Sequence, residues 1–383
     1  MVLIFKETEN GIVIRACKRC CSALGIFFHI KSMFETSSPF VYQLSQYGSL
    51  GVPMFFVISG YVITLSAESN LKNNKSPFAF LKARFLRIYP AFWASVIVVL
   101  LTPYVIESIS ALKSGEYIIP ENIFTKFNHI EWSNFLLLTK VFWATSHDLQ
   151  AEFNSVNSVY WTLAIEFQFY LVVSLALYFR KYYRHIIFII SIAAILTMFI
   201  PNKINFGLFI HYWPSFSVGI LLAYLYRNGV QSVSLLKNKA VLIVTSLFAT
   251  VLLISSVNFL GPRAILFAVC FGLFLWTISD IEKTLNKIKN SENLLFFWLL
   301  EPWLVLGTMS YSVYLLHGKI YHLPEMFVRQ LIDPENILYG VLIVIGTLLL
   351  CYPFYFFVER RFLSKNYKII QQKVLTKVSS GRS

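Results

Sequence analysis

The sequence predicts an all-α integral membrane protein with about ten transmembrane helices and both termini in the cytoplasm. Hydrophobic residues make up 57% of the 383-residue chain and charged residues only 14%, whereas soluble domains carry about 25% charged residues. The mean hydropathy is +0.63. Apolar runs near the ~20 residues that cross a bilayer recur along the whole chain, which favours a polytopic membrane protein.

Each predicted span is an apolar run of about that length. They cover residues 13–32, 49–67, 88–106, 159–179, 185–201, 206–226, 240–257, 262–280, 300–318 and 337–357. The first span is the least hydrophobic, because Lys18, Arg19 and Ser22 lie within it. In the long outer loop before Ser158, the apolar segment from Trp132 to Trp143 is too short to span. It is either a lid over an outward-facing site or a peripheral packing helix.

The net charge of +14 is interpreted as a topology signal. Most of the 33 Lys and Arg residues fall in the segments that this arrangement places on one side of the membrane. The positive-inside rule assigns that side, and both termini, to the cytoplasm. We therefore expect no nucleic-acid partner. We expect a single transmembrane domain over residues 1–364 and a basic cytoplasmic tail over residues 365–383 that lies on the lipids of the inner leaflet.

The cysteines and the N-terminus give no sign of a metal site or a cleaved leader. Cys17, Cys20 and Cys21 resemble half of a zinc site, but no second ligand pair follows at zinc spacing. We expect reduced, structural thiols and no metal. Residues 1–10 contain two Glu and no small-residue cleavage site, so no cleavable signal peptide is predicted there.

A histidine in the first predicted span carries the main functional signal. Lys18 and His29 are eleven positions apart, which is about three helical turns and roughly 16 Å on one face. One helix would thus hold a cation at a membrane surface and a proton-transfer group about half-way into a ~30 Å core. An enzyme that takes an anionic donor from one side would need this arrangement. The alternative is a helix-packing histidine with an ordinary flanking lysine.

Two arginines lie directly before the third predicted span. Arg84 and Arg87 are i,i+3 neighbours, so both guanidinium groups can point the same way. The planar guanidinium fork binds phosphate bidentately. Together with Lys18 and Arg19 they could converge on a phosphate-rich cytosolic ligand. The alternative is ordinary positive-inside charge.

The fourth predicted span carries a carboxylate near its outer end. Glu166 lies about 10 Å below that end at 1.5 Å per residue, and His29 approaches the outer end of its own span. The two side chains are therefore predicted to meet in the outer half of the membrane. A carboxylate beside an imidazole fixes the tautomer and stabilises the imidazolium during proton transfer. The alternative is a structural ion pair.

Further polar and aromatic residues lie in or beside the spans. They could line an acceptor site, or anchor the helices at the membrane interface. The candidates for substrate binding are Ser59, Tyr61, Trp161, Tyr170, His211, Tyr314 and His317. The Ser59-Gly60 step also favours close helix approach.

Taken together, these segments resemble the acyltransferase-3 family of integral membrane O-acyltransferases. The matching motifs, in order, are Lys18-x10-His29, the Phe-Phe-Val-Ile-Ser-Gly-Tyr run at 55–61, Arg84-x-x-Arg87-Ile-Tyr-Pro, Trp161-Thr-Leu-x-x-Glu166-x-x-Phe169-Tyr170, and Ser310-Tyr-Ser-x-Tyr314-Leu-Leu-His317. Lys18 stands where the family more often has Arg. We expect the form of the family without an appended SGNH-hydrolase-like domain.

The resemblance implies ten spans, an acyl-CoA donor (usually acetyl-CoA) bound from the cytoplasm, and O-acylation of a sugar. It implies that Arg84 and Arg87 bind the CoA end of the donor, with Lys18, Arg19 and Tyr89 as further donor-binding candidates. It also implies that His29 acts in catalysis, and we expect Glu166 to orient it.

The sequence thus predicts a bacterial inner (plasma) membrane enzyme that acylates an envelope glycan or a lipid-linked sugar. His29 would act as a general base or as a transient acyl carrier. The alternatives are a transporter or flippase of envelope glycolipids, and a membrane acyltransferase of another fold.

Overall fold

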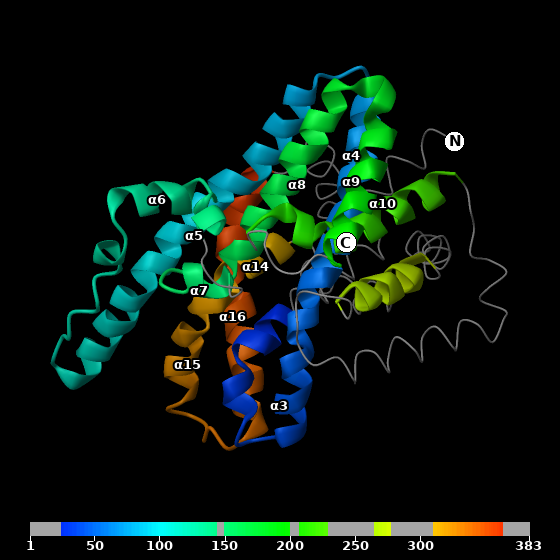
Figure 1. Ribbon diagram of the computed structural model, residues 1–383. Helices are drawn as coiled ribbons and strands as arrows, with labels where there is room; N and C mark the ends of the chain where they lie inside the picture. Colours follow the sequence, from blue (N-terminus) through cyan, green and yellow to red (C-terminus); the bar gives the residue numbers. More distant parts are fainter. Residues whose placement is uncertain (1–23, 144–148, 200–206, 229–263, 277–308, 363–383) are drawn as a thin grey trace, which may run out of the picture.

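The computed structural model describes residues 24–143, 149–199, 207–228, 264–276 and 309–362, and the regular secondary structure in these ranges is helical. Residues 24–29 are helical and continue into η1, and a further helix covers Ala264–Trp276. The other elements, shown in Figure 1, are η1 (Lys31–Phe34), α3 (Pro39–Gln46), η2 (Tyr47–Leu50), α4 (Gly51–Lys72), α5 (Pro77–Ser114), η3 (Ile123–Lys126), α6 (His129–Leu136), η4 (Lys140–Trp143), α7 (Leu149–Phe153), α8 (Tyr160–Tyr178), η5 (Arg180–Tyr182), α9 (Tyr183–Thr197), η6 (Phe209–His211), α10 (Trp213–Arg227), α14 (Ser310–Ile320), α15 (His322–Val328), α16 (Ile337–Phe357) and η7 (Glu359–Phe362).

Four described helices are long and apolar enough to cross a membrane: the continuous segment Pro39–Lys72, which ends in α4, and α5, α8 and α16. The all-helical prediction is therefore confirmed for the described residues. The spans at 159–179 and 337–357 match α8 and α16 within one residue at each end. The span at 240–257 and most of 13–32 lie outside the described residues, so ten spans and the side of both termini stay predictions.

Several spans have boundaries that differ from the prediction, and α4, α5, α9 and α10 are among them. α9 has only 15 residues, and α10 starts at Trp213 instead of 206 because Pro214 occupies its first turn. α5 has 38 residues, about 57 Å at 1.5 Å per residue, against a hydrocarbon core of ~30 Å. Its ends are set by capping: Ser76 Oγ accepts a hydrogen bond from the Ala79 N–H, and Gly115 ends the helix at a φ of 75°.

The apolar segment from Trp132 to Trp143 packs against α5. It is divided into α6 and η4 by Leu138, which has a φ of 60°. Two side chains of α5 bind its backbone: Trp93 Nε1 donates to the Leu136 carbonyl at 3.0 Å, and Tyr89 OH donates to the Leu137 carbonyl at 2.9 Å. Of the two alternatives for this segment, the peripheral packing helix fits these contacts.

α4 and α10 approach each other through glycine. A Cβ on Gly60 would overlap the carbonyl oxygen of Phe216, and a Cβ on Gly219 would overlap that of Val57. Any larger residue at either position would force the two backbones apart. This contact agrees with the close helix approach expected from the Ser59-Gly60 step.

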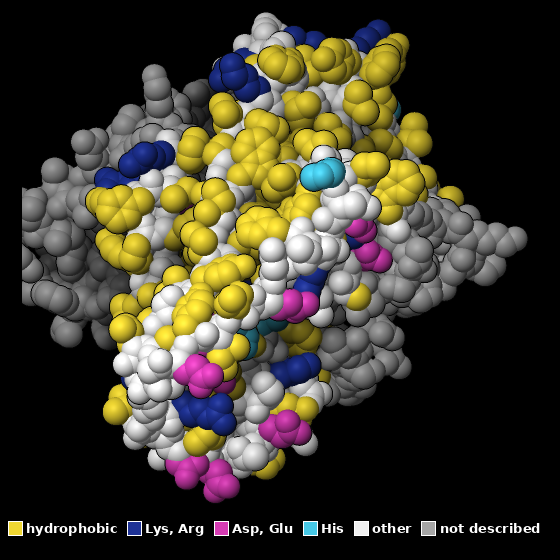
Figure 2. Space-filling model, turned by 90° about the vertical axis from the view of Figure 1, so that its left-hand side faces the viewer, with side chains coloured by type: hydrophobic (Ala, Val, Ile, Leu, Met, Phe, Trp, Pro, Cys, Tyr) yellow, Lys and Arg dark blue, Asp and Glu magenta, His cyan; other side chains and the backbone are white. Residues whose placement is uncertain are grey.

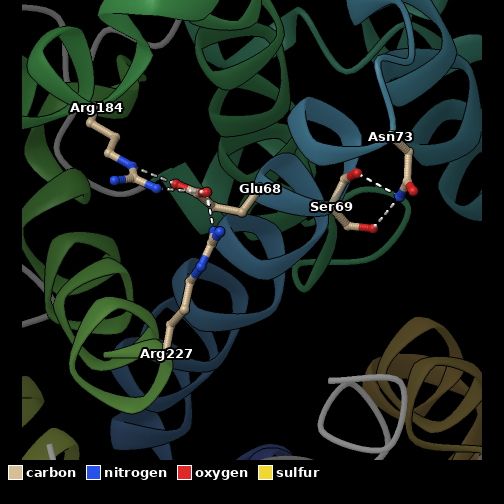
Figure 3. Close-up of polar contacts among 5 residues, drawn as sticks. All are labelled: Glu68, Ser69, Asn73, Arg184 and Arg227. Carbon is tan, nitrogen blue, oxygen red and sulfur yellow. Dashed lines mark hydrogen bonds and ion pairs between the residues drawn. The ribbon is translucent and has the colours of Figure 1, made fainter. Parts of the chain in front are cut away.

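A buried carboxylate ties together the ends of three helices, as Figure 3 shows. Glu68 of α4 has a 7% exposed side chain and accepts hydrogen bonds from Arg184 of α9 at 3.0 and 3.1 Å and from Arg227 of α10. One turn further, Asn73 Nδ2 donates to the Ser69 carbonyl at 2.7 Å beyond the end of α4. The carboxylate therefore joins α4, α9 and α10 at one end of the bundle.

The surface has the charge distribution of a membrane protein. In Figure 2, hydrophobic side chains cover most of the upper and middle part of the face, the upper edge carries Lys and Arg without Asp or Glu, and the middle and lower part carries side chains of both charges. The upper end of Figure 1 holds the α4–α5 turn and the α8–α9 connection, where Lys72, Lys75, Arg180 and Lys181 are exposed. We call this the basic end of the molecule.

We predict that Glu68→Gln lowers the free energy of unfolding by about 1–2 kcal/mol, because two arginines lose their ionic partner. The effect stays below that of a fully buried pair, since the side chains of Arg184 and Arg227 are 61% and 31% exposed and water screens them. Chemical unfolding in detergent micelles measures the change. Glu35→Gln, at an exposed carboxylate, is the matched control, and equal midpoints for the two variants would contradict the prediction.

Candidate active site

A cavity of about 150 Å³ lies between the segment 24–29 and helices α4, α5, α8 and α14. This volume has room for several water molecules or a small chemical group. Its wall includes nine of the predicted site residues: His29, Ser59, Arg84, Arg87, Trp161, Glu166, Tyr170, Tyr314 and His317. The structure thus brings together residues that are up to almost three hundred positions apart in the chain.

A buried carboxylate with two hydroxyl donors forms one part of the wall. Glu166 Oε1 accepts hydrogen bonds from Ser59 Oγ at 2.9 Å and from Tyr170 OH at 2.6 Å. Tyr170 is one turn further along α8, and Ser59 comes from α4. The glycine that follows Ser59 brings α10 close behind α4 and leaves Ser59 on the cavity side. The carboxylate is therefore held by two helices.

Two histidines form another part of the wall. The rings of His29 and His317 meet edge to face, with centroids 5.0 Å apart and planes at 70°. His317 is 3% exposed, and its Nδ1 lies 2.9 Å from the carbonyl oxygens of Val313 and Tyr314. His29 is half-buried, and its ring nitrogens form no hydrogen bond with the described residues.

The two arginines lie about two and three turns into α5, on the side that faces the cavity. The Arg84 guanidinium carbon is 5.5 Å from the centroid of the Phe80 ring and 5.9 Å from that of Tyr170. Because α5 begins at the basic end, the arginines are on the way from that end to Glu166 and the histidines. Planar, always-charged guanidinium groups are suited to a phosphate or a carboxylate ligand.

Helix α14 carries Tyr314 and His317, and polar contacts fix it from three sides. Glu359, in η7, accepts hydrogen bonds from the Ser312 N–H at 3.0 Å and from Ser312 Oγ. Tyr311 OH donates to the Ile88 carbonyl of α5 at 3.0 Å, and Asn157 Nδ2 donates to the Leu315 carbonyl at 3.0 Å. Tyr314 OH donates to the Val159 carbonyl and lies 2.6 Å from Thr162 Oγ1.

The structure has no direct hydrogen bond between Glu166 and His29. Both side chains line the cavity, but Glu166 bonds to Ser59 and Tyr170, and the His29 ring contacts His317. The pairing of Glu166 with His29, and the orienting role expected of Glu166, therefore stay predictions.

Three other candidates do not line the cavity. Tyr61 packs edge-on against Tyr226 at 6.4 Å, and Tyr89 binds the Leu137 carbonyl through its hydroxyl. Both follow a lining residue by two positions, a rotation of about 200° on a helix, which turns them to the other side. His211 lies in η6, away from the wall. Lys18 and Arg19 lie outside the described residues.

The sequence interpretation missed some polar residues of the site. Ser158 and Tyr311 line the cavity, and Glu359 holds α14 from behind. Tyr311 belongs to the motif that contains Tyr314, and a carboxylate directly after the apolar run 337–357 was a visible signal for Glu359. No group of three or more His, Cys, Asp or Glu side chains in the described ranges could hold a metal ion. Cys270 and Cys351 are buried thiols without a disulfide.

Comparison with known proteins identifies the family. A family model described as an acyltransferase domain matches residues 15–356. The chain belongs to this acyltransferase family. It is also 25% identical over 372 residues to the peptidoglycan O-acetyltransferase OatA of Listeria monocytogenes serovar 1/2a, across 86% of this chain and 56% of that protein. The chain therefore spans about half the length of this curated relative. No solved structure matches it.

The family match agrees with the apolar helices of the described residues and covers most of the chain. The matched range contains all nine cavity-lining candidates and reaches the end of α16. The acyltransferase-3 resemblance drawn from the five motifs is thus confirmed. The roles of individual residues within the cavity remain predictions.

We predict that Glu359→Ala lowers the free energy of unfolding by about 2 kcal/mol, because the Ser312 N–H and hydroxyl lose their acceptor in a buried place. Unfolding in detergent measures the change. The exposed carboxylate of Glu335 provides the control, since Glu335→Ala removes the same atoms from the surface. A Glu359→Ala protein as stable as the control variant would show that α14 does not depend on this contact.

Proposed function

We propose that the chain transfers an acyl group, most simply acetyl, from cytosolic acyl-CoA to a hydroxyl of an envelope glycan or a lipid-linked sugar in a bacterial plasma membrane. The observation that carries the proposal is that one cavity holds two arginines, a buried carboxylate and two histidines. The two arginines suit a donor that carries phosphate groups. Transfer of an acyl group to a hydroxyl needs a base or a nucleophile, which the carboxylate and the histidines can supply. The similarity to a peptidoglycan O-acetyltransferase supports acetyl as the acyl group and a glycan as the acceptor.

The charge distribution supports entry of the donor from the basic end. Lys72, Lys75, Arg180 and Lys181 are exposed there, and the positive-inside rule assigns such an end to the cytoplasm. Arg84 and Arg87 would then hold the donor's phosphates, and Lys18 and Arg19 would add two more cations. In this orientation both termini are cytoplasmic, with a transmembrane domain over residues 1–364 and a tail over 365–383 against membrane lipids.

The acceptor hydroxyl would approach the carboxylate side of the cavity. Glu166 has two hydroxyl partners in the protein, Ser59 and Tyr170, and a sugar hydroxyl can replace or join them. The aromatic rings of Trp161 and Tyr314 offer flat apolar faces to a sugar ring. In this proposal Glu166 orients the acceptor, and His29 attacks the acyl group or removes the hydroxyl proton.

The family assignment favours this enzyme over a transporter or flippase of envelope glycolipids, and no feature of the cavity argues specifically for transport. The two functions are separated by mass spectrometry of envelope glycans from cells with and without the protein. A discrete acyl mass that depends on the protein supports the enzyme. Unchanged acylation with a loss of glycan delivery to the surface would overturn it.

We predict that His29→Ala abolishes acyl transfer to the acceptor without changing the stability of the protein, because His29 lines the cavity and its ring nitrogens form no hydrogen bond with the described residues. The expected loss of turnover is about 100-fold or more. The control is His322→Ala, at an exposed histidine that bonds Glu325 away from the cavity. Glycan acylation near the wild-type level in a well-folded His29→Ala protein would refute the assignment.

We predict that Arg84→Ala and Arg87→Ala each weaken binding of acyl-CoA by about tenfold, the value of one charge-assisted hydrogen bond. Arg87→Lys should also weaken it, because a point charge replaces a planar fork. Calorimetric titration with CoA measures the affinity. Lys82→Ala removes an exposed charge from the same helix outside the cavity and should leave it unchanged. Equal affinity in all four variants would mean that the arginines serve only membrane topology.

A further inference from the structure

The two histidines of the cavity differ in how their ring nitrogens are used. Nδ1 of His317 lies 2.9 Å from two backbone carbonyl oxygens, those of Val313 and Tyr314. A carbonyl only accepts hydrogen bonds, so Nδ1 must carry the proton. In the neutral ring, Nε2 is then an unprotonated acceptor.

The acceptor nitrogen of His317 faces the segment that carries His29. A Cβ placed on Gly25 would lie 3.2 Å from His317 Nε2, whereas the other ring atoms are further away. Gly25 is one helical turn before His29, on the same helical segment. The ring centroids of His29 and His317 are 5.0 Å apart, and rotation of the His29 side chain can bring one nitrogen of each within hydrogen-bond reach.

His29 has the opposite character. It is half-buried, lines the cavity, and its nitrogens form no hydrogen bond with the described residues. It is therefore available to a reactant, whereas His317 has a fixed orientation and a fixed tautomer. A nucleophile beside a base that a third group orients is the arrangement found in covalent acyl-transfer enzymes.

We infer that His317 is a second catalytic histidine, whose Nε2 accepts the ring proton of His29 while His29 attacks the acyl carbonyl. The inference rests on the proposed acyl-transfer function and assigns the proton path within it. The carbonyls of Val313 and Tyr314 orient His317, and Glu359, through Ser312, fixes the helix that carries it. The Nε2 atom is thereby aimed at one place in the cavity.

The step balances in atoms and charge. One nitrogen of neutral His29 forms a bond to the acyl carbon, the bond from that carbon to the thioester sulfur breaks, and the proton on the second nitrogen moves to His317 Nε2. The thiolate then takes this proton and leaves as the thiol. When the acceptor oxygen attacks the acyl-histidine, His317 takes the hydroxyl proton and returns it to the second nitrogen of His29 as the bond from the acyl carbon to the first nitrogen breaks, which restores the starting tautomer of both rings.

The test uses diethyl pyrocarbonate, a small acylating reagent that modifies neutral histidine without the natural donor. The rate at which His29 is modified in the full-length protein is followed by peptide mass spectrometry. In His317→Asn the rate is expected to fall about tenfold or more, because the base is lost while an amide can still donate to the backbone carbonyls. His322→Asn is the control and should react at the wild-type rate.

Rescue by added bases separates catalysis from a structural role. With His317→Gly, imidazoles of increasing basicity should restore His29 modification in proportion to their basicity, since a structural defect would not follow basicity. An unchanged rate in His317→Asn, or rescue that is independent of basicity, would overturn the inference.

Nitrogen NMR of the wild-type protein gives a measurement that needs no variant to fold. Its histidine signals should report a protonated Nδ1 and an unprotonated Nε2 for His317, and a proton on Nε2 would overturn the inference. Failure of the proposed function can be told apart from failure of this inference. If only the proposed function is wrong, acyl-CoA leaves the glycan unmodified, but diethyl pyrocarbonate still modifies His29 at a rate that depends on His317.

Discussion

The site depends on one constraint, which is that polar groups inside an apolar bundle must be satisfied by other parts of the protein. Helix α14 meets this constraint at several points. The Ser312 N–H in its first turn donates to Glu359, and its Leu315 carbonyl accepts a hydrogen bond from Asn157. Its two tyrosines donate to the Ile88 carbonyl of α5 and to the Val159 carbonyl just before α8. Each contact satisfies a polar group and also fixes the helix, so the histidine near its end has a defined place.

The same constraint explains why the cavity has two chemically different parts. Glu166 accepts its hydrogen bonds from hydroxyl groups, which can be exchanged for a hydroxyl of a ligand. His317 donates from Nδ1 to backbone carbonyls of its own helix, which cannot move away. Glu166 can thus exchange its hydrogen-bond partners for those of a ligand, whereas the His317 ring is held in one orientation.

Much of the cavity wall was predictable from residue spacing. The lining residues of α5 are Arg84, Arg87 and Ile88, an i, i+3, i+4 set that follows directly from helical geometry. Tyr61 and Tyr89 were chosen because they belong to the motifs, whereas helical spacing turns both away from the cavity wall. The directions of Glu166 and His29 were not predictable in the same way, because counting residues gives the position along a helix, whereas the rotation of each helix depends on its packing partners.

The helices themselves were predicted better than their ends. Hydropathy marks where lipid contact stops, but the backbone hydrogen bonds of a helix continue until a cap ends them. α5 therefore continues on both sides of its apolar part, from the cap at Ser76 to the left-handed glycine at 115. The outer segment around α6 then packs against α5 instead of covering the cavity.

The glycine contact between α4 and α10 has a consequence for motion. Where a backbone carbonyl rests against a glycine Cα, neither helix can slide past the other without collision, and Glu68 joins the same two helices at their basic ends. α4 and α10 are therefore locked to each other by contacts along their length. The other described walls of the cavity, which are the segment 24–29, α5, α8 and α14, have no such backbone contact with this pair, so widening the cavity would displace those walls and leave α4 and α10 in place.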